Sequence, residues 1–452
     1  MYRPPAPLPR SPVGALVHHV LDRERDLLTL LPRDAYRRRV GRLGRSRRTI
    51  LLVNDPAAVR EVMIDRADAF PKNDLFDGAL SPLVRDSVFN SHGDRWRHQR
   101  ALIEPAFAHM HVRRAFEAMS AACDDAETRL DAAAAAGRPV ALDAAMSRVT
   151  ADVVFRALFS ESLESDAARD IFEAFAEYQA TVAQISPARL ILGRPFATPP
   201  APEACRAACE RIRARLRDWI AERLEAPARE DIVGALIAAR HPQTGARFDL
   251  EELVDQIGVF FLAGHETTAG ALTWALFMLS QDPAPAERLR AETHDAAGDG
   301  TVTLDHVKRL NRARAAFREA MRLYPPLPFL PRIALEATRI AGARVPRGAM
   351  IMIAPWTLHR CEDLWPASDR FDPDRFLPER ERGIEKGAYL PFGLGPRLCV
   401  GAAFATIEAT MILARLMRRY DWRAQAPERV RPLVRLTLRP AEPILMRLRR
   451  RS

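Results

Sequence analysis

A single cysteine, Cys399, lies in a glycine-rich segment that reads LPFGLGPRLCVGAAF. Gly393 and Gly395 permit backbone conformations and close approaches that a side chain would block. Apolar residues at helical spacing follow, so the pattern predicts a helix over 404–419 whose positive end lies near the sulfur. These surroundings favour a thiolate, which can be a nucleophile, a redox centre or a metal ligand. A buried structural cysteine is the alternative, and it is the commoner case for an isolated cysteine.

The second unusual segment, AGHETT at residues 263–268, lies in the middle of the longest predicted helix, which begins with a capping-box pattern at Asp249 and runs to about Gln281. Gly264 costs helix stability relative to alanine. A helical threonine can hydrogen-bond to the carbonyl one turn earlier and bend the helix. The segment therefore predicts a bend and a groove that admits water or a small molecule. The alternative, a polar stripe on a half-exposed helix, is disfavoured by the apolar flanks, and we expect His265 to pack between helices.

Two pairs of residues are spaced so that a helix places their side chains on one face. Glu319 and Arg322, three apart, can form an ion pair, and the apolar residues beside them favour a buried structural pair. Trp96 and Arg100 are one turn apart, and an indole N–H beside a guanidinium can bind a carboxylate or phosphate, although an exposed helix face is the alternative. Arg397, just before the cysteine, can stabilise a thiolate or pair with an anionic ligand whose metal the sulfur binds.

These segments together resemble the cytochrome P450 family, the haem-thiolate monooxygenases, over nearly the whole chain. They follow the family's order, which is a tryptophan–arginine helix, AGHETT, EAMR, FDPDRF and finally FGLGPRLCVG. The resemblance implies the cytochrome P450 fold, mainly α with small β-sheets, as a single large haem-binding domain. It also implies haem b as the cofactor, with Cys399 as the axial ligand of the iron and Phe392 near the sulfur. The family positions that grip the haem propionates match Trp96, Arg100, Arg332 and Arg397.

The resemblance assigns a reaction as well as a cofactor. Glu266 and Thr267 match the family's acid–alcohol pair, in which the threonine holds water or hydroperoxide and the acid relays protons from solvent. A thiolate ligand donates electron density through iron and promotes O–O cleavage, which needs those protons. We therefore predict a monooxygenase that inserts one oxygen atom from O2 into an apolar small molecule by hydroxylation or epoxidation. Glu319 and Arg322 match a structural pair that locks with Arg375 of the FDPDRF segment.

The elements that hold these residues are mostly helices. Helical spacing and capping signals predict a short helix that begins at Asn54-Asp55-Pro56 and longer ones at 94–136, 144–159, 167–181, 203–225 and 312–323. Short apolar runs predict strands at 49–53, 333–340 and 350–353, and a closing strand pair at 433–438 and 443–446. Loops or connections are predicted at 72–90, 186–202 and 355–391. We expect one compact unit, with an N-terminal arm and first helix over 1–48 and a haem-binding body over 49–452.

The composition of the chain indicates where in the cell the protein is expected to be and which kinds of partner it is expected to bind. The chain has 452 residues, and its net charge of +10 is carried almost entirely by arginine. That balance favours an acidic partner, and because the arginines are interspersed with acids we expect no nucleic-acid binding. Five widely spaced cysteines fit neither a disulfide framework nor a zinc motif, so we expect a reducing, cytoplasmic location. The proline-rich N-terminus and the polar residues inside the most apolar helix indicate neither a signal peptide nor a membrane span.

The electron donor is predicted to be a separate protein, because no flavin or iron–sulfur segment follows Cys399. We expect an acidic ferredoxin with its reductase, and a flavodoxin is the alternative. The docking face is predicted from the basic residues that lie near the cysteine in sequence, namely Arg397, Arg415, Arg418 and Arg419.

The substrate pocket is expected, by family analogy, to be formed by residues 72–90, 172–202, 259–264 and 327–330. Its lining is apolar, so a lipid, terpenoid, steroid or aromatic compound fits; the residues are Phe76, Leu83, Val88, Phe260 and Phe329.

Two other function classes remain open from the sequence. The first is a non-catalytic haem-binding or gas-sensing protein, against which the Glu266–Thr267 pair argues because a binder needs no proton relay. The second is a hydrolase with a cysteine nucleophile, which requires a histidine base. His359 is the nearest candidate in sequence, and nothing in its turn-rich segment marks it as a base.

Overall fold

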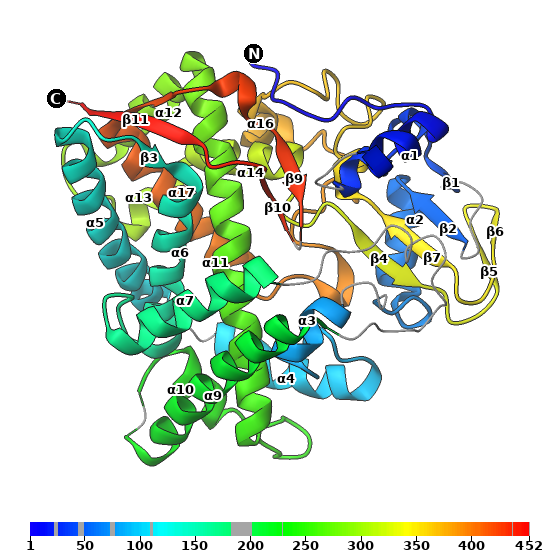
Figure 1. Cartoon of the computed structure of the whole chain (residues 1–452), viewed down its shortest axis with the longest axis horizontal. Helices are drawn as coiled ribbons and strands as arrows, with labels where there is room; N and C mark the ends of the chain where they lie inside the picture. Colours follow the sequence, from blue (N-terminus) through cyan, green and yellow to red (C-terminus); the bar gives the residue numbers. More distant parts are fainter. Residues whose placement is uncertain are drawn as a thin grey trace.

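The structure is a computed structural model that describes residues 1–21, 26–43, 49–72, 77–108, 112–181, 201–227, 229–435 and 437–451. Helices form the larger part of the molecule, and the strands of the largest sheet lie together at the other end, beside the N-terminal helix α1 (Pro12–Leu21) (Figure 1). This is the mainly helical architecture with small β-sheets that the sequence predicts. No helix in the described parts of the chain is both long and apolar enough to cross a membrane.

The longest helix, α11 (Leu250–Gln281), runs through the centre of the helical part (Figure 1). It begins with the predicted capping box, in which the Asp249 carboxylate accepts the Glu252 N–H and the Glu252 carboxylate accepts the Asp249 N–H. The other helices are α2 (Pro56–Arg60), α3 (Asp77–Val84), α4 (Gly93–Ala108), α5 (Val112–Ala135), α6 (Leu142–Phe159), α7 (Asp166–Thr181), α9 (Glu203–Glu225), α10 (Ile232–Ala238), α12 (Pro283–Ala297), α13 (Leu304–Arg309), α14 (Asn311–Leu323), α15 (Pro355–Leu358), α16 (Pro378–Glu381) and α17 (Ala402–Arg419).

The largest sheet has four strands in the order β1 (Val40–Arg42), β2 (Ile50–Val53), β7 (Met350–Ile353) and β4 (Leu330–Ile333). Strand β2 pairs with β7 in parallel, and β1 and β4 pair antiparallel on the two sides. Both central strands are wholly buried, as their unbroken apolar sequences predict. The smaller sheets are β5 (Thr338–Ile340) with β6 (Ala343–Val345), β9 (Pro432–Val434) with β10 (Leu438–Pro440), and β3 (Val140–Ala141), β11 (Leu445–Arg450) and β8 (Tyr420–Ala424) in that order.

Two large hydrophobic cores meet along α11. The first core takes side chains from α5, α14, α17 and the second half of α11, from Ala269 to Leu279. The second core takes side chains from α3, α7, α9 and the first half of α11, from Leu253 to Leu262. Residues 263–268, the AGHETT segment, belong to neither apolar core. The middle of the central helix is therefore the place where the packing opens.

Most of the predicted elements are confirmed. The single strand expected at 333–340 is divided between β4 and β5, which belong to different sheets, and the loop expected at 355–391 contains the short helices α15 and α16. Three further predictions are wrong in part. The expected loop at 72–90 contains α3, although Pro82 lies inside that helix. The buried side chains of Leu80, Leu83 and Val84 pack in the second core, and this burial outweighs the helix-breaking tendency of proline. The continuous helix expected at 94–136 is two helices, α4 and α5.

The third error concerns the C-terminal strands. The runs at 433–438 and 443–446 do not pair with each other, because β9 and β10 already form a hairpin between Pro432 and Pro440. Strand β11 pairs instead with β8, directly after α17, and with β3. Apolar runs show that strands exist, whereas the choice of partner depends on the rest of the fold. Most of the connection expected at 186–202 lies outside the described residues.

Candidate active site

A cavity of about 330 Å³ lies where the two cores separate, and it is lined mainly by apolar side chains. Ala263 is exposed although it lies in the middle of the central helix, because this part of α11 faces the cavity. The segments 259–264 and 327–330 border the cavity as predicted. All of the predicted site residues border this one cavity, namely Trp96, Arg100, Glu266, Thr267, Arg332, Phe392, Arg397 and Cys399. The fold thus brings together residues that are up to 303 positions apart (96 to 399).

Cys399 lies in a tight turn directly before α17. Its N–H donates to the carbonyl of Phe392 at 3.0 Å, which closes the loop, and its side chain reaches the cavity. Gly395 has a φ of +71°, and a Cβ there would lie 2.1 Å from the carbonyl oxygen of Met63, so only glycine lets the loop pack this closely. Protein atoms surround the thiol on its other sides, and this burial raises its pKa, while the Gly401 N–H, Arg100 and Lys72 oppose the rise. The turn alone does not secure the thiolate that the sequence suggested.

Cationic side chains gather around the same cavity. The Arg397 guanidinium carbon lies 4.2 Å from the centre of the Trp96 ring, and its nitrogens donate to the carbonyls of Ser91 and Val88. The indole therefore meets Arg397 rather than Arg100, which donates instead to the Leu398 carbonyl at 3.0 Å and to Glu104 at 2.6 Å.

Arg332 is the most deeply buried of these cations. It is 7% exposed, it donates to the Pro331 carbonyl, and burial lowers its pKa to about 10. Within the described residues no carboxylate forms an ion pair with Arg332 or Arg397. A buried cation without a counter-ion is costly, so this end of the cavity is suited to an anionic ligand. Lys72 and His92 were not among the predicted site residues. Burial lowers the pKa of His92, and the charges of Arg397, Lys72 and Arg332 lower it further, so these groups lie close together.

The AGHETT segment supplies the polar part of the cavity wall. Thr267 donates its hydroxyl proton to the Ala263 carbonyl at 2.7 Å, as predicted, but the helix continues without interruption to Gln281. The opening comes from small side chains rather than from a break in the helix. A Cβ on Gly264 would lie 3.0 Å from Val154 of α6, so the missing side chain also permits close helix packing.

Glu266 is the only carboxylate among the residues that line the described cavity. Its Oε1 accepts a hydrogen bond from the Thr437 hydroxyl at 2.6 Å. Burial raises the Glu266 pKa, and the hydrogen bonds from Thr437 and Gln179 and the charge of Arg439 oppose that rise. Glu266 therefore lies between the cavity and α7, where burial and its polar neighbours act on its pKa in opposite directions.

The predicted structural ion pair is confirmed. Two nitrogens of the Arg322 guanidinium, Nε and Nη2, donate to the Glu319 carboxylate at 2.7 and 2.8 Å, and both side chains are fully buried. Arg375 lies 3.5 Å from Glu319, as the FDPDRF match implied. Arg322 also donates to the carbonyls of His359, Ser368 and Arg370, so the pair holds the irregular segment that leads to the cysteine turn.

His359 and His265 both have packing roles in the described structure. His359 has both ring nitrogens occupied, because Nδ1 contacts the Arg322 carbonyl and Nε2 accepts the Leu390 N–H at 2.9 Å. Burial lowers the pKa of His359 to about 3. This removes the histidine base that a cysteine hydrolase would need. His265 packs as predicted, stacked on Phe261 with its Nδ1 against the Phe261 carbonyl.

The apolar lining is confirmed in part. Val88, Phe260 and Phe329 border the cavity, but Leu83 does not. Because α3 is a helix, Leu80 and Val84 share the face toward the cavity and Leu83 points into the second core. Phe76 lies outside the described residues. Phe172, the first residue of the predicted lining segment 172–202, packs near His265 and is not among the cavity-lining residues. Four residues that do line the cavity were not predicted from the sequence, namely Thr437 and the α6 residues Val154, Ala157 and Leu158.

Comparison with known protein families identifies the family of this chain. The sequence profile of the family described as "Cytochrome P450" matches residues 9–447. The chain belongs to the cytochrome P450 family. It is 32% identical to cyclooctatin synthase of Streptomyces melanosporofaciens over 86% of this chain and 84% of that protein. It is 31% identical to cyclooctat-9-en-7-ol 5-monooxygenase of the same organism over 84% and 82% of the two chains.

Solved structures agree with the fold of this P450. The haem domain of cytochrome P450DA has a TM-score of 0.80 at 25% identity and covers 92% of this chain and 90% of its own. A mutant of that domain has a TM-score of 0.84 at 26% identity and covers 100% and 98% of the two chains. The chain is thus a cytochrome P450 monooxygenase, and its cofactor is haem. The site fits that group, because a thiol borders the same cavity as Arg332 and Arg397, whose guanidinium groups pair with no carboxylate in the described residues and suit the two carboxylates of haem.

Proposed function

We propose that Cys399 is the axial ligand of the haem iron and that Arg332, Arg397, Arg100 and Trp96 hold the propionates. The observation that carries this assignment is the placement of the buried Arg332 and the partly buried Arg397, without carboxylate partners in the described chain, around the cavity that the Cys399 thiol enters. Phe392 shapes the loop around the sulfur through the bond from the Cys399 N–H to its carbonyl. Metal binding deprotonates a coordinating thiol outright, which overcomes the raised pKa of Cys399.

The assignment of the ligand is tested by Cys399→Ser. The reduced parent protein should give the strongly red-shifted carbon-monoxide spectrum of thiolate-ligated haem, and the variant should lose that shift. Cys361→Ser is the matched control, because Cys361 is buried away from the cavity and should leave the spectrum unchanged. A variant at Cys399 that keeps the red-shifted band would refute the assignment.

Glu266 and Thr267 are the proposed proton-transfer residues of the reaction. Bound haem supplies the activation of O2 and the insertion of one oxygen atom into the substrate. The Thr267 hydroxyl donates a hydrogen bond to the Ala263 carbonyl, so its oxygen can accept a hydrogen bond from a water in the cavity. Glu266 contacts the cavity on one side and Gln179 of α7 on the other, so it can pass a proton from outside to that water.

Thr267→Ala and Glu266→Gln test this role. Both should lower the product formed per pair of electrons by about 10-fold or more, since a positioned acid typically contributes about 100-fold or more, while electron consumption continues. Thr273→Val is the control, because Thr273 makes the same bond to the carbonyl one turn earlier, at 2.8 Å, without touching the cavity. Full coupling in Thr267→Ala would exclude the role of Thr267.

The proposed substrate is a largely apolar molecule with a terpenoid-like hydrocarbon skeleton. The lining supports this through Leu80, Val84, Phe107, Phe260 and Phe329, of which Phe107 and Phe260 pack edge to face with ring centres 5.0 Å apart. Of two relatives in the comparison, one is by name a cyclooctatin synthase and the other a 5-monooxygenase of cyclooctat-9-en-7-ol. Titration with terpenoid, steroid and fatty-acid panels, read as the spectral change on displacement of iron-bound water, tests the class. Tighter binding of charged or polar compounds would contradict it.

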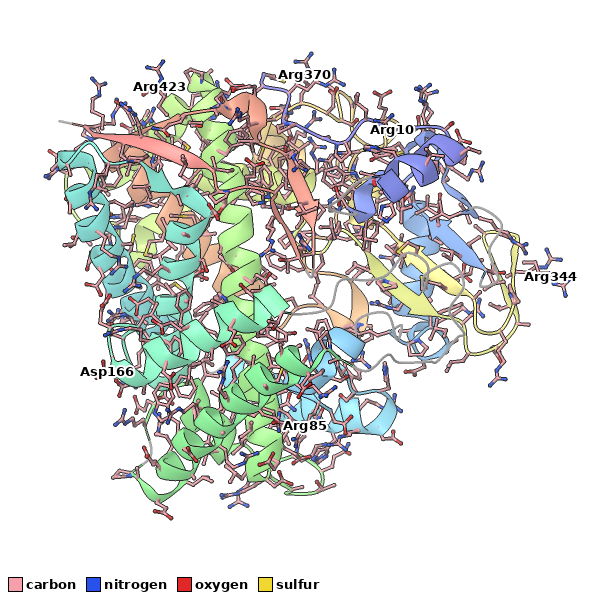
Figure 2. The ribbon with its side chains drawn as sticks, in the orientation of Figure 1. Arg10, Arg85, Asp166, Arg344, Arg370 and Arg423 are labelled. Carbon is pink, nitrogen blue, oxygen red and sulfur yellow. The ribbon has the colours of Figure 1, made fainter. Side chains whose placement is uncertain are left out.

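The proposed electron donor is an acidic ferredoxin with its reductase, and the proposed location is the cytoplasm. The docking arginines predicted from the sequence do not support this, because Arg415 and Arg419 pair with carboxylates of α5 and Arg418 donates to the Gly298 and Gly300 carbonyls. The remaining support is the net charge of +10, which is spread over the surface, as Arg10, Arg344 and Arg423 show at separate edges of the molecule (Figure 2).

Turnover with an acidic ferredoxin should slow as ionic strength rises. A rate independent of salt, or a preference for a flavodoxin, would count against this donor. Free thiols at all five cysteines support a reducing compartment, which cell fractionation of the source organism would check.

A further inference from the structure

The hairpin β9–β10 brings a residue far from the chemical motifs to the cavity wall. It packs against the middle of α11, where the Leu438 carbonyl lies 3.3 Å from the position of a Cβ on Gly270. The Leu438 N–H donates to the Pro326 carbonyl at 2.9 Å, which fixes the hairpin to the turn after α14. Thr437 directly precedes Leu438, so its position is set by both of these contacts.

Thr437 makes one close polar contact toward the cavity. Its hydroxyl donates to Glu266 Oε1 at 2.6 Å, the residue is 6% exposed, and both residues border the cavity. A hydroxyl has one proton, so Oε1 must accept, and a proton taken up by Glu266 is directed to its other oxygen, Oε2. A hydrogen bond to a carboxylate in a site of low dielectric is stronger and more directional than one in water.

The other groups that face Glu266 come from two elements. Tyr178 and Gln179 approach from α7, and Arg439 approaches from β10 of the same hairpin. Burial raises the Glu266 pKa, the Thr437 hydrogen bond is the largest effect that opposes it, and Arg439 and Gln179 act in the same direction as Thr437. The hairpin therefore supplies both the Thr437 hydroxyl, which donates a hydrogen bond to this carboxyl group, and the positive charge of Arg439, which acts on it.

We propose that Thr437 is a positioning residue for Glu266: its hydroxyl holds Oε1 in place on the cavity wall, and this hydrogen bond stabilises the ionised form of the carboxyl group relative to the neutral form. This inference rests on the proton transfer proposed for Glu266 and Thr267. Because Thr437 also borders the cavity, a substrate that presses on the hairpin acts on the same hydrogen bond. Substrate binding and proton delivery are thereby linked through one hydroxyl group.

The test compares Thr437→Val, which keeps the shape and removes the donor, with Thr437→Ser, which keeps the donor. The Glu266 carboxylate band is isolated as the infrared difference between each protein and its Glu266→Gln derivative, and it is followed over pH. Loss of a hydrogen bond to the charged form should raise the Glu266 pKa by about one unit in Thr437→Val, with little change in Thr437→Ser. The same Val variant should form roughly 3- to 10-fold less product per pair of electrons, and Ser should restore it.

Three results separate the possible failures. A Thr437→Val protein that titrates and couples like the parent overturns the role of Thr437. A Glu266→Gln protein that remains fully coupled instead overturns the underlying proton transfer. If Thr437→Val does not bind haem, Thr437→Ala, which adds no bulk, provides the same measurement. Thr273→Val is the control for loss of a threonine hydroxyl that lies in α11 but not at the cavity.

Discussion

The two hydrophobic cores on either side of the cavity are secured by charges in different ways. At the first core, Glu319 and Arg322 form an ion pair with both side chains 0% exposed. At the second core, Arg213 of α9 binds Asp255 at 2.6 Å and Glu251 at 3.0 Å, and the Glu251 side chain is 45% exposed. Arg213 also donates to the Leu83 carbonyl of α3, so this network fastens the helices that cover the cavity.

The difference indicates two kinds of mechanical role. A fully enclosed ion pair is very costly to break, because the partner left behind is a buried charge. A network that reaches solvent is weaker, since water can replace a lost partner. The first core should therefore act as a permanent frame for the cysteine turn, while the second can yield when a substrate enters. Four substitutions follow in order of decreasing expected effect, and the first three test this contrast directly.

Arg322→Met should have the largest effect. It leaves the Glu319 carboxylate buried without its main partner and removes the donors to three backbone carbonyls. We expect the free energy of unfolding of the haem-loaded protein to fall by about 3–5 kcal/mol, measured by urea denaturation. The double variant Glu319→Leu with Arg322→Met should recover part of that loss, because no isolated charge remains. A single variant as stable as the parent would mean that the first core is not held by this pair.

Arg213→Met should cost about 1–3 kcal/mol, and the cost should depend on pH. Burial already raises the Asp255 pKa, and loss of Arg213 removes the main group that opposes the rise. An acid whose pKa is raised by folding binds more protons in the folded state, so the variant gains stability as pH falls through that raised pKa. The deficit should therefore be smaller near about pH 5 than near about pH 7.

Arg217→Met is the matched control for that substitution. Arg217 pairs with the same Glu251 at 2.5 Å, but the side chains are 37% and 45% exposed. Its loss should cost less than about 1 kcal/mol with no comparable dependence on Asp255. Equal costs for Arg213→Met and Arg217→Met would erase the distinction between the enclosed and the exposed ends of this network.

Gly264→Ala should have the smallest effect on stability. Alanine gains about 1 kcal/mol of helix propensity over glycine, while the new Cβ meets Val154 at 3.0 Å and forces a small adjustment. We expect the two terms to cancel to within about 1 kcal/mol in thermal unfolding. In a Val154→Ala background the contact is relieved, so Gly264→Ala should then stabilise the protein. Failure to do so would show that Val154 is not what limits a side chain at this position.

The sequence predicted the residues that act locally better than those that act across the fold. Cys399, the AGHETT segment and the Glu319–Arg322 pair are recognisable from short spacings, and the structure places the first two at the cavity and buries the ion pair, as expected. Apolar runs and caps likewise identified most helices and strands, because burial and capping depend on neighbours along the chain.

Errors arose where a partner comes from a distant element. Thr437 lies 171 positions from Glu266, and nothing in its own surroundings marks it as a hydrogen-bond donor to a cavity carboxylate. Arg415 and Arg419 were expected at a docking surface, yet α5 supplies acids at helical spacing that neutralise them. Leu83 was assigned to the cavity by family analogy, in a segment that was expected to be a loop, whereas helix α3 directs this side chain into the second core.

The hydrogen bonds from Arg322 to the carbonyls of His359, Ser368 and Arg370 affect how well this segment tolerates substitutions. Every residue type carries a carbonyl, so this segment is held by groups that mutation of its side chains leaves unchanged. Surface residues between α15 and the cysteine turn can therefore drift without loosening the turn. Substitutions in the cavity lining and substitutions on the outer surface then change separate parts of the molecule, and neither removes the bonds from Arg322 that hold this segment.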